Sequence, residues 1–290
     1  MAASVTPLTD AVGAEVSGVD LVSLTDSEFS QIERAWHRYS ALLFRGQRLT
    51  DDDLLSFSRR FGELDPPPNQ EHGRQSPPGY PDVYVVSNVL DEKGQPIGAL
   101  GAGELVWHTD MSYLEVPPDA SMLYALEVPP EGGNTWLCGM QAAWASLPEE
   151  LKARVKGRRI KHDGTYNSGG FLRQGVTPTD DPHTAPGAWH PAVCMHPATG
   201  VPSLYLGRRR NSYIEGLSPQ ESETLLDQLW SHIANPQFAY EHRWRVGDLL
   251  LWDNRSTMHR RGPFEERSRR VMHRTQIKGR YPPRAYVAAA

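Results

Sequence analysis

The stretch GDLLLWDNRSTMHRRGPFEERSRRVMHRT, residues 247–275, begins as a strand pattern and ends among charged residues. It opens with a Gly-Asp turn, continues through the apolar run GDLLLWDN at 247–254, and reaches His259 five residues later. A short apolar run that follows turn residues is typical of a β-strand. The stretch therefore predicts a strand that leads into a histidine.

Other short apolar runs lie between turn residues along the rest of the chain. They are ALLF (41–44), VYVVSNV (83–89), ASMLYALEV (120–128) and SLYLG (203–207). The 25 glycines and 24 prolines fall largely between such runs, where they favour turns. Strands at this spacing predict a mainly β sandwich or barrel.

Helix signals are fewer and have recognisable capping residues. We expect helices at 27–39 after Thr25 and Asp26, from Thr50 to Arg60, after Pro148 in EELKARV, and from Ser218 to about Ile233. The helices thus flank the strands, mainly in the N-terminal third and near 219–233. Residues 162–190 show no periodicity and are rich in Gly, Pro and Asp, so we expect a long loop, either a functional lid or a surface excursion.

Composition limits the class of protein. The 290 residues show no composition break, so we expect one domain over residues 1–290. Net charge is −5 with scattered basic residues, which does not favour nucleic acid as a partner. We find neither an apolar run of about 20 residues, which a membrane span needs, nor a secretory signal. The chain has only two cysteines, Cys138 and Cys194, which favours a reducing cytoplasm as its location. We expect both side chains to be buried in the protein as small hydrophobic residues.

A possible metal site begins in VWHTDMSY at 106–113. His108 and Asp110 are two residues apart, and in an extended segment such side chains point to one side and can converge on one ion. The pair alone is weak evidence. With His259 it gives two histidines and one carboxylate, the facial triad of non-haem iron(II) oxygenases. Zinc has the same ligands in some hydrolases, so both metals remain open at this point.

Arg270 lies eleven residues past His259, and Arg274 lies four residues further along. If residues 270–274 form a strand, Arg270 and Arg274 face the same side as Met272. The planar fork of arginine suits a carboxylate held through two hydrogen bonds. Arginines of a charged surface stretch are the alternative. A site for an anionic co-substrate would favour iron over zinc.

Taken together, these residues resemble the family of taurine dioxygenase and 2,4-dichlorophenoxyacetate dioxygenase. WHTD (107–110) and WDNRSTMH (252–259) are similar to its two metal motifs, and Arg270 stands at the family's spacing from His259. Further similar segments are GAEVSGVDL (13–21), LLFRGQ (42–47), FSRRFGEL (57–64) and GGNTWLCGMQAAWASLP (132–148). The resemblance covers about residues 10–280. It implies a double-stranded β-helix, or jelly roll, with flanking helices.

The resemblance also implies a chemistry. His108, Asp110 and His259 would bind Fe(II), and Arg270 and Thr135 would hold the distant carboxylate of 2-oxoglutarate. With O2, the enzyme would hydroxylate a small anionic substrate and release succinate and CO2. Asp110 indicates hydroxylation, because related halogenases have a small residue there that leaves room for chloride.

The resemblance says less about the substrate. Arg274 matches a position that holds an anionic group in several members, which implies a sulfonate or an aryloxyalkanoate carboxylate, with a structural arginine as the alternative. Glu104 replaces an asparagine that contacts the amine in taurine dioxygenases, and His72 is a candidate for a substrate-contacting histidine. An amino acid or alkyl sulfate substrate, a zinc hydrolase and a non-catalytic jelly-roll binding protein are the alternatives. Family members are often oligomers, so we expect a possible homo-oligomer.

Overall fold

Two facing β-sheets form the centre of the computed structural model, which describes residues 3–66, 76–102 and 105–287. Within these residues the larger sheet has nine strands, and β4 (Leu64–Asp65) pairs with β18 beside the main order. That order is β1 (Ser4–Pro7), β2 (Ala14–Ser17), β3 (Ala41–Phe44), β16 (Leu249–Asp253), β8 (Ala120–Glu127), β18 (Val271–Ile277), β5 (Tyr84–Ser87), β6 (Ala99–Leu100). The smaller sheet runs β15 (Ala239–His242), β9 (Thr135–Gly139), β17 (Thr257–Arg261), β7 (Leu105–His108).

Strand β16 confirms the strand expected at 247–254 and explains its continuous apolar run. Successive side chains of a strand point to opposite faces of the sheet. Leu249 and Leu251 pack on the outer face, whereas Leu250 and Trp252 lie in the core between the two sheets. Because both faces of β16 are covered, its sequence shows no alternation of apolar and polar residues.

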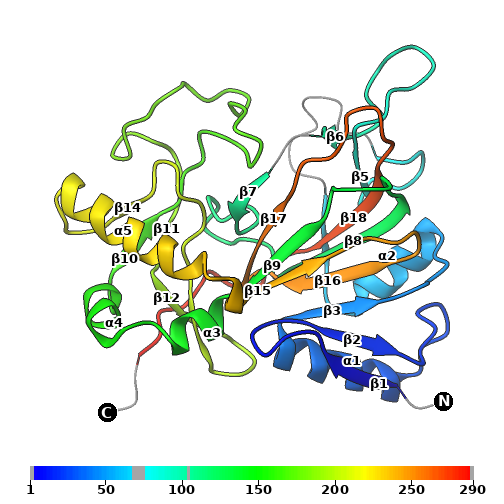
Figure 1. The fold of residues 1–290 in the computed structure, drawn as a ribbon, viewed down its shortest axis with the longest axis horizontal. Coiled ribbons are helices and arrows are strands. Elements are labelled where there is room, and N and C mark those ends of the chain that lie inside the picture. Colours follow the sequence, from blue (N-terminus) through cyan, green and yellow to red (C-terminus); the bar gives the residue numbers. More distant parts are fainter. Residues whose placement is uncertain (1–2, 67–75, 103–104, 288–290) are drawn as a thin grey trace.

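Helices α1 (Asp26–Tyr39) and α2 (Asp51–Arg59) cover the outer face of the larger sheet (Figure 1). Thr25 and Thr50 begin them with capping boxes, in which the N-cap hydroxyl and the carboxylate three residues later satisfy each other's backbone N–H groups. Both helices expected in this part of the chain are therefore confirmed.

A second group of helices and short strands packs on the outer face of the smaller sheet, at the left of Figure 1. Ser218 forms the expected capping box of α5. Helix α3 was not expected, and the run expected at 203–207 is a strand only as far as Leu204. The elements are α3 (Met140–Ala145), α4 (Glu149–Val155), α5 (Pro219–Ile233), the 3-10 turn Pro236–Phe238, β10 (Arg159–Lys161), β11 (Trp189–Pro191), β12 (Val193–Met195), β13 (Pro202–Leu204) and β14 (Tyr213–Ile214).

The segment at 162–188 is irregular, as expected, but it is closed by its own hydrogen bonds. The N–H groups of His162 and Gly164 donate to the carbonyls of Ala188 and Pro186, which joins the two ends of the segment. The Asn167 side chain accepts from two backbone N–H groups in its outer turn. The segment thus has a defined fold although it lacks regular secondary structure.

Both cysteines are buried and unpaired, as expected. Burial raises the pKa of the Cys138 thiol to about 12, and burial likewise raises the pKa of Cys194. Within the described residues, no helix combines the length and the apolar character that a membrane crossing requires.

Candidate metal centre

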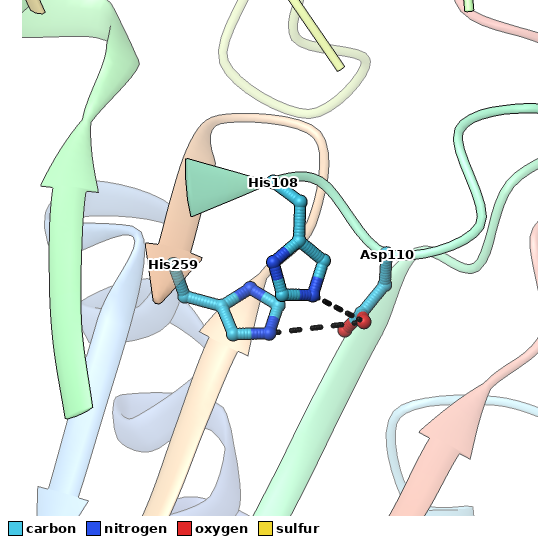
Figure 2. Close-up of side chains that lie close together, drawn as sticks. All are labelled: His108, Asp110 and His259. Atoms are coloured by element: carbon cyan, nitrogen blue, oxygen red, sulfur yellow. Dashed lines mark ion pairs between the residues drawn. The ribbon is translucent and has the colours of Figure 1, made fainter. Parts of the chain in front are cut away.

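Two histidines from neighbouring strands and one aspartate converge inside the smaller sheet (Figure 2). His108 is the last residue of β7, and it lies directly opposite His259 of β17 in the antiparallel pair. The Nε2 atoms of both rings lie 3.7 Å from Oδ1 of Asp110. All three possible ligand atoms lie within 4.8 Å of one another, and all three residues are buried.

Asp110 reaches the site by a different route from the one expected. Strand β7 ends at His108, so the alternation of a strand does not place the carboxylate. Asp110 instead lies in a turn, and its backbone is held by Asn254, whose amide accepts from the Asp110 N–H at 2.8 Å and donates to its carbonyl at 2.9 Å. The N–H of Thr109 donates to the carbonyl of Gly207 at 3.0 Å. The turn is thus fixed by two segments far away in the sequence.

The protonation states suit a metal ligand set. Burial opposes ionisation of Asp110, but the charge of Arg274 outweighs this effect and holds the pKa of Asp110 well below the usual range. Burial, together with nearby His108, lowers the pKa of His259 well below its usual value, so its ring is neutral. His108 Nδ1–H donates to the Val106 carbonyl at 2.8 Å, which leaves the lone pair of Nε2 directed at the site. Two imidazoles and a carboxylate are a ligand set that a divalent transition metal takes.

Arg274 approaches the same carboxylate from β18 of the larger sheet. Its guanidinium forms an ion pair with Oδ2 of Asp110 and also donates to the Ser121 hydroxyl at 2.8 Å. Ser121 in turn donates to Asp110 Oδ2 at 2.9 Å. One oxygen of Asp110 therefore faces the histidines while the other is held by Arg274 and Ser121.

A second cationic site surrounds Arg270, which immediately precedes β18. Its side chain is only 1% exposed, and its Nε has no hydrogen-bond partner among the described residues. Burial and the neighbouring charge of Arg261 lower the pKa of Arg270 to about 9. The Trp244 ring lies 6.0 Å from this guanidinium, and its Nε1–H donates to the Thr135 hydroxyl at 3.1 Å. Trp244 thus links Arg270 and Thr135, the two residues expected to contact 2-oxoglutarate.

An unpaired buried cation is costly unless an anion joins it, so this pocket fits a carboxylate. The two arginines do not follow a simple strand alternation, because the β18–β8 register shifts between Val271 and Met272. Both are nevertheless buried and do not lie on the surface.

The other expected substrate residues have different outcomes. Glu104 and His72 lie outside the described residues. In the long loop, Phe171 is 66% exposed. Asn254, Ser121 and Arg208 were not singled out from the sequence as site residues; only Arg208 had a visible signal, because it opens the run Arg208-Arg209-Arg210.

Comparison with known proteins identifies the family. The model of the family described as taurine catabolism dioxygenase TauD, TfdA family, matches residues 4–276. The chain belongs to this family. An (S)-phenoxypropionate/alpha-ketoglutarate-dioxygenase from Sphingobium herbicidovorans is 32% identical over 287 residues, which cover 95% of this chain and 94% of the relative. An alpha-ketoglutarate-dependent 2,4-dichlorophenoxyacetate dioxygenase from Cupriavidus pinatubonensis is 35% identical, over 92% of this chain and 95% of the relative.

The TauD/TfdA assignment is supported equally by structure. The crystal structure of AAD-2 in complex with Mn(II) and N-oxalylglycine superposes with a TM-score of 0.77 at 31% identity, covering 97% of this chain and 99% of that chain. The expected mainly β jelly roll with flanking helices is therefore confirmed. The protein is an iron(II)- and 2-oxoglutarate-dependent dioxygenase, with Fe(II), 2-oxoglutarate and O2 as cofactor and co-substrates. Family membership removes the zinc hydrolase and non-catalytic readings.

Proposed function

We propose that the protein hydroxylates a small organic acid of the aryloxyalkanoate type, with His108, Asp110 and His259 as the Fe(II) ligands. The observation that carries the proposal is the buried triad, whose three donor atoms lie within 4.8 Å of one another. The bound iron, together with 2-oxoglutarate and O2, supplies the oxidising power for C–H hydroxylation, and succinate and CO2 are released. One oxygen atom of O2 enters the substrate and the other enters succinate.

Arg270 and Thr135 are proposed to hold the distant carboxylate of 2-oxoglutarate. The buried Nε of Arg270, without a partner among the described residues, supports this role. An incoming carboxylate would supply the missing acceptor and a neutralising charge. Trp244 donates to Thr135 and so orients the hydroxyl of that residue.

Asp110 and Arg274 are proposed to keep the metal centre in a hydroxylating form. The ion pair with Arg274 and the hydrogen bond from Ser121 keep the Asp110 carboxylate ionised and fix one of its oxygens. A carboxylate at this position occupies the space that chloride takes in related halogenases. The free Nε of Arg274, buried and without a partner among the described residues, supports its proposed contact with an anionic substrate.

The substrate class rests on relatives and on the cationic interior. Two relatives at more than 30% identity are named for phenoxypropionate and 2,4-dichlorophenoxyacetate. Hydroxylation at the carbon beside the ether oxygen would give a hemiacetal-type product, which loses the aryl alcohol. We further propose that residues 1–290 form one domain. The buried free thiols agree with a cytoplasmic location. A homo-oligomer is proposed on the family resemblance alone, and light scattering would test it.

Succinate formation tests the proposal. Purified protein with Fe(II), 2-oxoglutarate and O2 is assayed against aryloxyalkanoates, sulfonates, alkyl sulfates and amino acids. We expect substrate-dependent succinate, with release of a phenol, from at least one aryloxyalkanoate. Stimulation only by members of the other three classes would contradict the proposed substrate class.

The metal ligands are tested in the same assay. His108→Ala and Asp110→Ala should each abolish the visible charge-transfer band that Fe(II) and 2-oxoglutarate give together under anaerobic conditions, and turnover should fall with it. His183→Ala is the matched control, because His183 is exposed and lies outside the triad. Full activity in both ligand variants would refute the assignment of the site.

A further inference from the structure

Three consecutive arginines after β13 have very different surroundings. Arg209 is partly exposed and pairs with Glu223 and Asp227 at 2.6 and 2.7 Å. Arg210 pairs with Asp180 at 2.8 Å. Arg208 is only 7% exposed and pairs with no carboxylate of the described residues. The run therefore contains two arginines with surface ion pairs and one buried cation.

The Arg208 guanidinium is incompletely satisfied. One terminal nitrogen donates to the backbone carbonyl of Tyr166 at 2.5 Å. Its Nε is buried and has no hydrogen-bond partner among the described residues. A buried arginine without a counter-ion is destabilising, because the desolvation of its charge is not repaid. Such a group is retained at low cost only if an anion binds it.

The backbone beside Arg208 contacts the residue between two of the proposed metal ligands. The carbonyl of Gly207 accepts a hydrogen bond from the N–H of Thr109, the residue between His108 and Asp110. The charge of Arg208 also acts on His259, whose pKa it helps to lower, and the charge of Asp110 acts on Arg208. Arg208 thus lies within electrostatic range of the triad.

A second arginine, Arg173, acts on the charge of Arg208. Burial, followed by the charge of Arg173, lowers the pKa of Arg208 to about 10 even though Asp163 and Asp110 oppose this shift. The Arg173 guanidinium lies 4.0 Å from the centre of the Tyr113 ring, three residues beyond Asp110. Arg173 and Arg208 are therefore electrostatic neighbours, and Arg173 also contacts a residue that follows Asp110 in the chain.

We propose that Arg208, in addition to Arg274, binds the carboxylate of the substrate and so contributes to the preference for anionic substrates. The inference rests on the proposed function and names a further residue for its substrate. Arg274 also lies beside the triad, but part of its guanidinium is already taken by Asp110 and Ser121. Arg208 has no such carboxylate among the described residues, so the carboxylate of a substrate would supply the missing hydrogen-bond acceptor and counter-charge of its guanidinium.

The test compares Arg208→Met with Arg209→Met. Both changes remove one arginine from the same run, but Arg209 is paired at the surface and serves as the matched control. Anaerobic protein with Fe(II) and 2-oxoglutarate is titrated with 2,4-dichlorophenoxyacetate, and the shift of the visible band gives Kd. Loss of a charged hydrogen bond should raise Kd about tenfold or more in Arg208→Met, with no comparable change in Arg209→Met.

Three further measurements distinguish substrate binding from a structural effect. The Kd for 2-oxoglutarate should stay unchanged in Arg208→Met. The primary amide of the same acid should bind the wild type and Arg208→Met equally, because it carries no charge. Arg208→Lys, which keeps the charge but loses the fork, should give an intermediate Kd for the acid.

The outcomes separate the inference from the proposed function. An unchanged Kd for the acid in Arg208→Met, absence of acid binding in the wild type, or equal losses for acid and amide would each overturn the inference. Binding that depends on Arg208, without turnover of any aryloxyalkanoate by the wild type, would overturn the proposed function and leave the inference standing.

Discussion

Arg270 and Arg274 carry the same side chain four residues apart, but among the described residues only Arg274 has an anionic partner. Arg274 pairs with Asp110, whereas Arg270 is buried with an unsatisfied Nε and a neighbouring cation, Arg261. A buried charge without a counter-ion destabilises the ligand-free protein. Binding of a dicarboxylate would offset this cost. In its proposed role, Arg270 would therefore couple co-substrate binding to the stability of the fold.

We predict that Arg270→Met leaves the free protein as stable as the wild type or more stable. The same substitution should remove the stabilisation by 2-oxoglutarate, which for a ligand at about 100 times its Kd amounts to about 2.7 kcal/mol. Thermal unfolding with Mn(II) in place of iron, with and without 2-oxoglutarate, measures both effects. A variant that is less stable without ligand, yet still stabilised by 2-oxoglutarate, would contradict this prediction.

At the residue scale the sequence indicated the candidate metal ligands but not the residues that hold them in place. Residue type and spacing within two segments pointed to the triad and to Arg270, and the family resemblance supplied their expected roles. Asn254 could not be found this way, because an asparagine after a strand is an ordinary turn residue. Its hydrogen bonds to the backbone of Asp110 span 144 positions of the chain, and only the fold brings the two residues together.

Gly207 is the position at which the segment after β13 approaches the metal ligands. Its φ is +68°, a left-handed conformation, and a Cβ added there would lie 1.9 Å from Nδ1 of the buried His162 ring. The tight fit places the Gly207 carbonyl against Thr109. Glycine is thus required both by backbone conformation and by packing.

We expect Gly207→Ala to destabilise the protein by about 2–4 kcal/mol and to weaken metal binding, because His162 or the 207–208 backbone must move. Gly200→Ala is the matched control: Gly200 also has a positive φ, +69°, but a Cβ there meets nothing within 4 Å. It should cost only about 1 kcal/mol. Chemical denaturation and a Mn(II) titration measure the two effects, and equal losses in both variants would show that packing against His162 is unimportant.

At the element scale, the signals that succeeded are local ones. The capping boxes at Thr25, Thr50 and Ser218 each involve residues three positions apart, so the sequence contains all the information that they need. The strand predicted at 203–207 was too long at its C-terminal end, because the apolar residues continue past β13 to the turn at Gly207. Burial there comes from packing on other segments, which an apolar run alone does not distinguish from a strand.

At the scale of the whole molecule, a buried charge network connects the larger sheet with the part of the chain that covers the smaller one. Asp253, at the end of β16, accepts from Arg255 at 2.6 Å and from His196 at 2.9 Å. Arg255 and Arg280 also pair with Asp119 at 3.6 and 3.2 Å. The network therefore joins β16, the start of β8, the β12–β13 hairpin and the C-terminal segment.

Burial opposes the ionisation of Asp253, but Arg255 and His196 hold its pKa well below the usual range. The unfolded chain thus binds a proton at a higher pH than the folded chain. The contribution of Asp253 to stability is present above about pH 4 and is lost as the pH falls below it. Asp253→Asn should cost about 3–5 kcal/mol at neutral pH, because Arg255 loses its buried partner, and should flatten the fall in stability below pH 4.

Urea unfolding between about pH 3 and pH 7 measures that dependence. Asp180→Asn, which breaks the exposed pair with Arg210, is the control and should change stability little at any pH. The same slope below pH 4 in wild type and Asp253→Asn would assign the acid sensitivity to other carboxylates.

The arrangement of the two sheets was beyond the reach of sequence patterns. Strand β16 pairs with β3, about 200 positions earlier, and nothing local specifies this partner. The patterns reached only a sandwich or barrel, and the family resemblance supplied the jelly roll. The residues of β9 and β17, which include Thr135 and His259, were recognised from the sequence only as motifs. Their pairing with each other, and the pairing of β17 with β7, were not predicted.

The two buried thiols have a practical consequence. Cys138 and Cys194 are the only cysteines in the chain, and both are shielded and remain protonated at neutral pH. Thiol-reactive dyes and spin labels therefore have no native target in the folded protein. A single cysteine introduced at exposed Phe171 can be labelled without removing either native residue, and its fluorescence would follow the 162–188 segment directly while co-substrate and substrate bind.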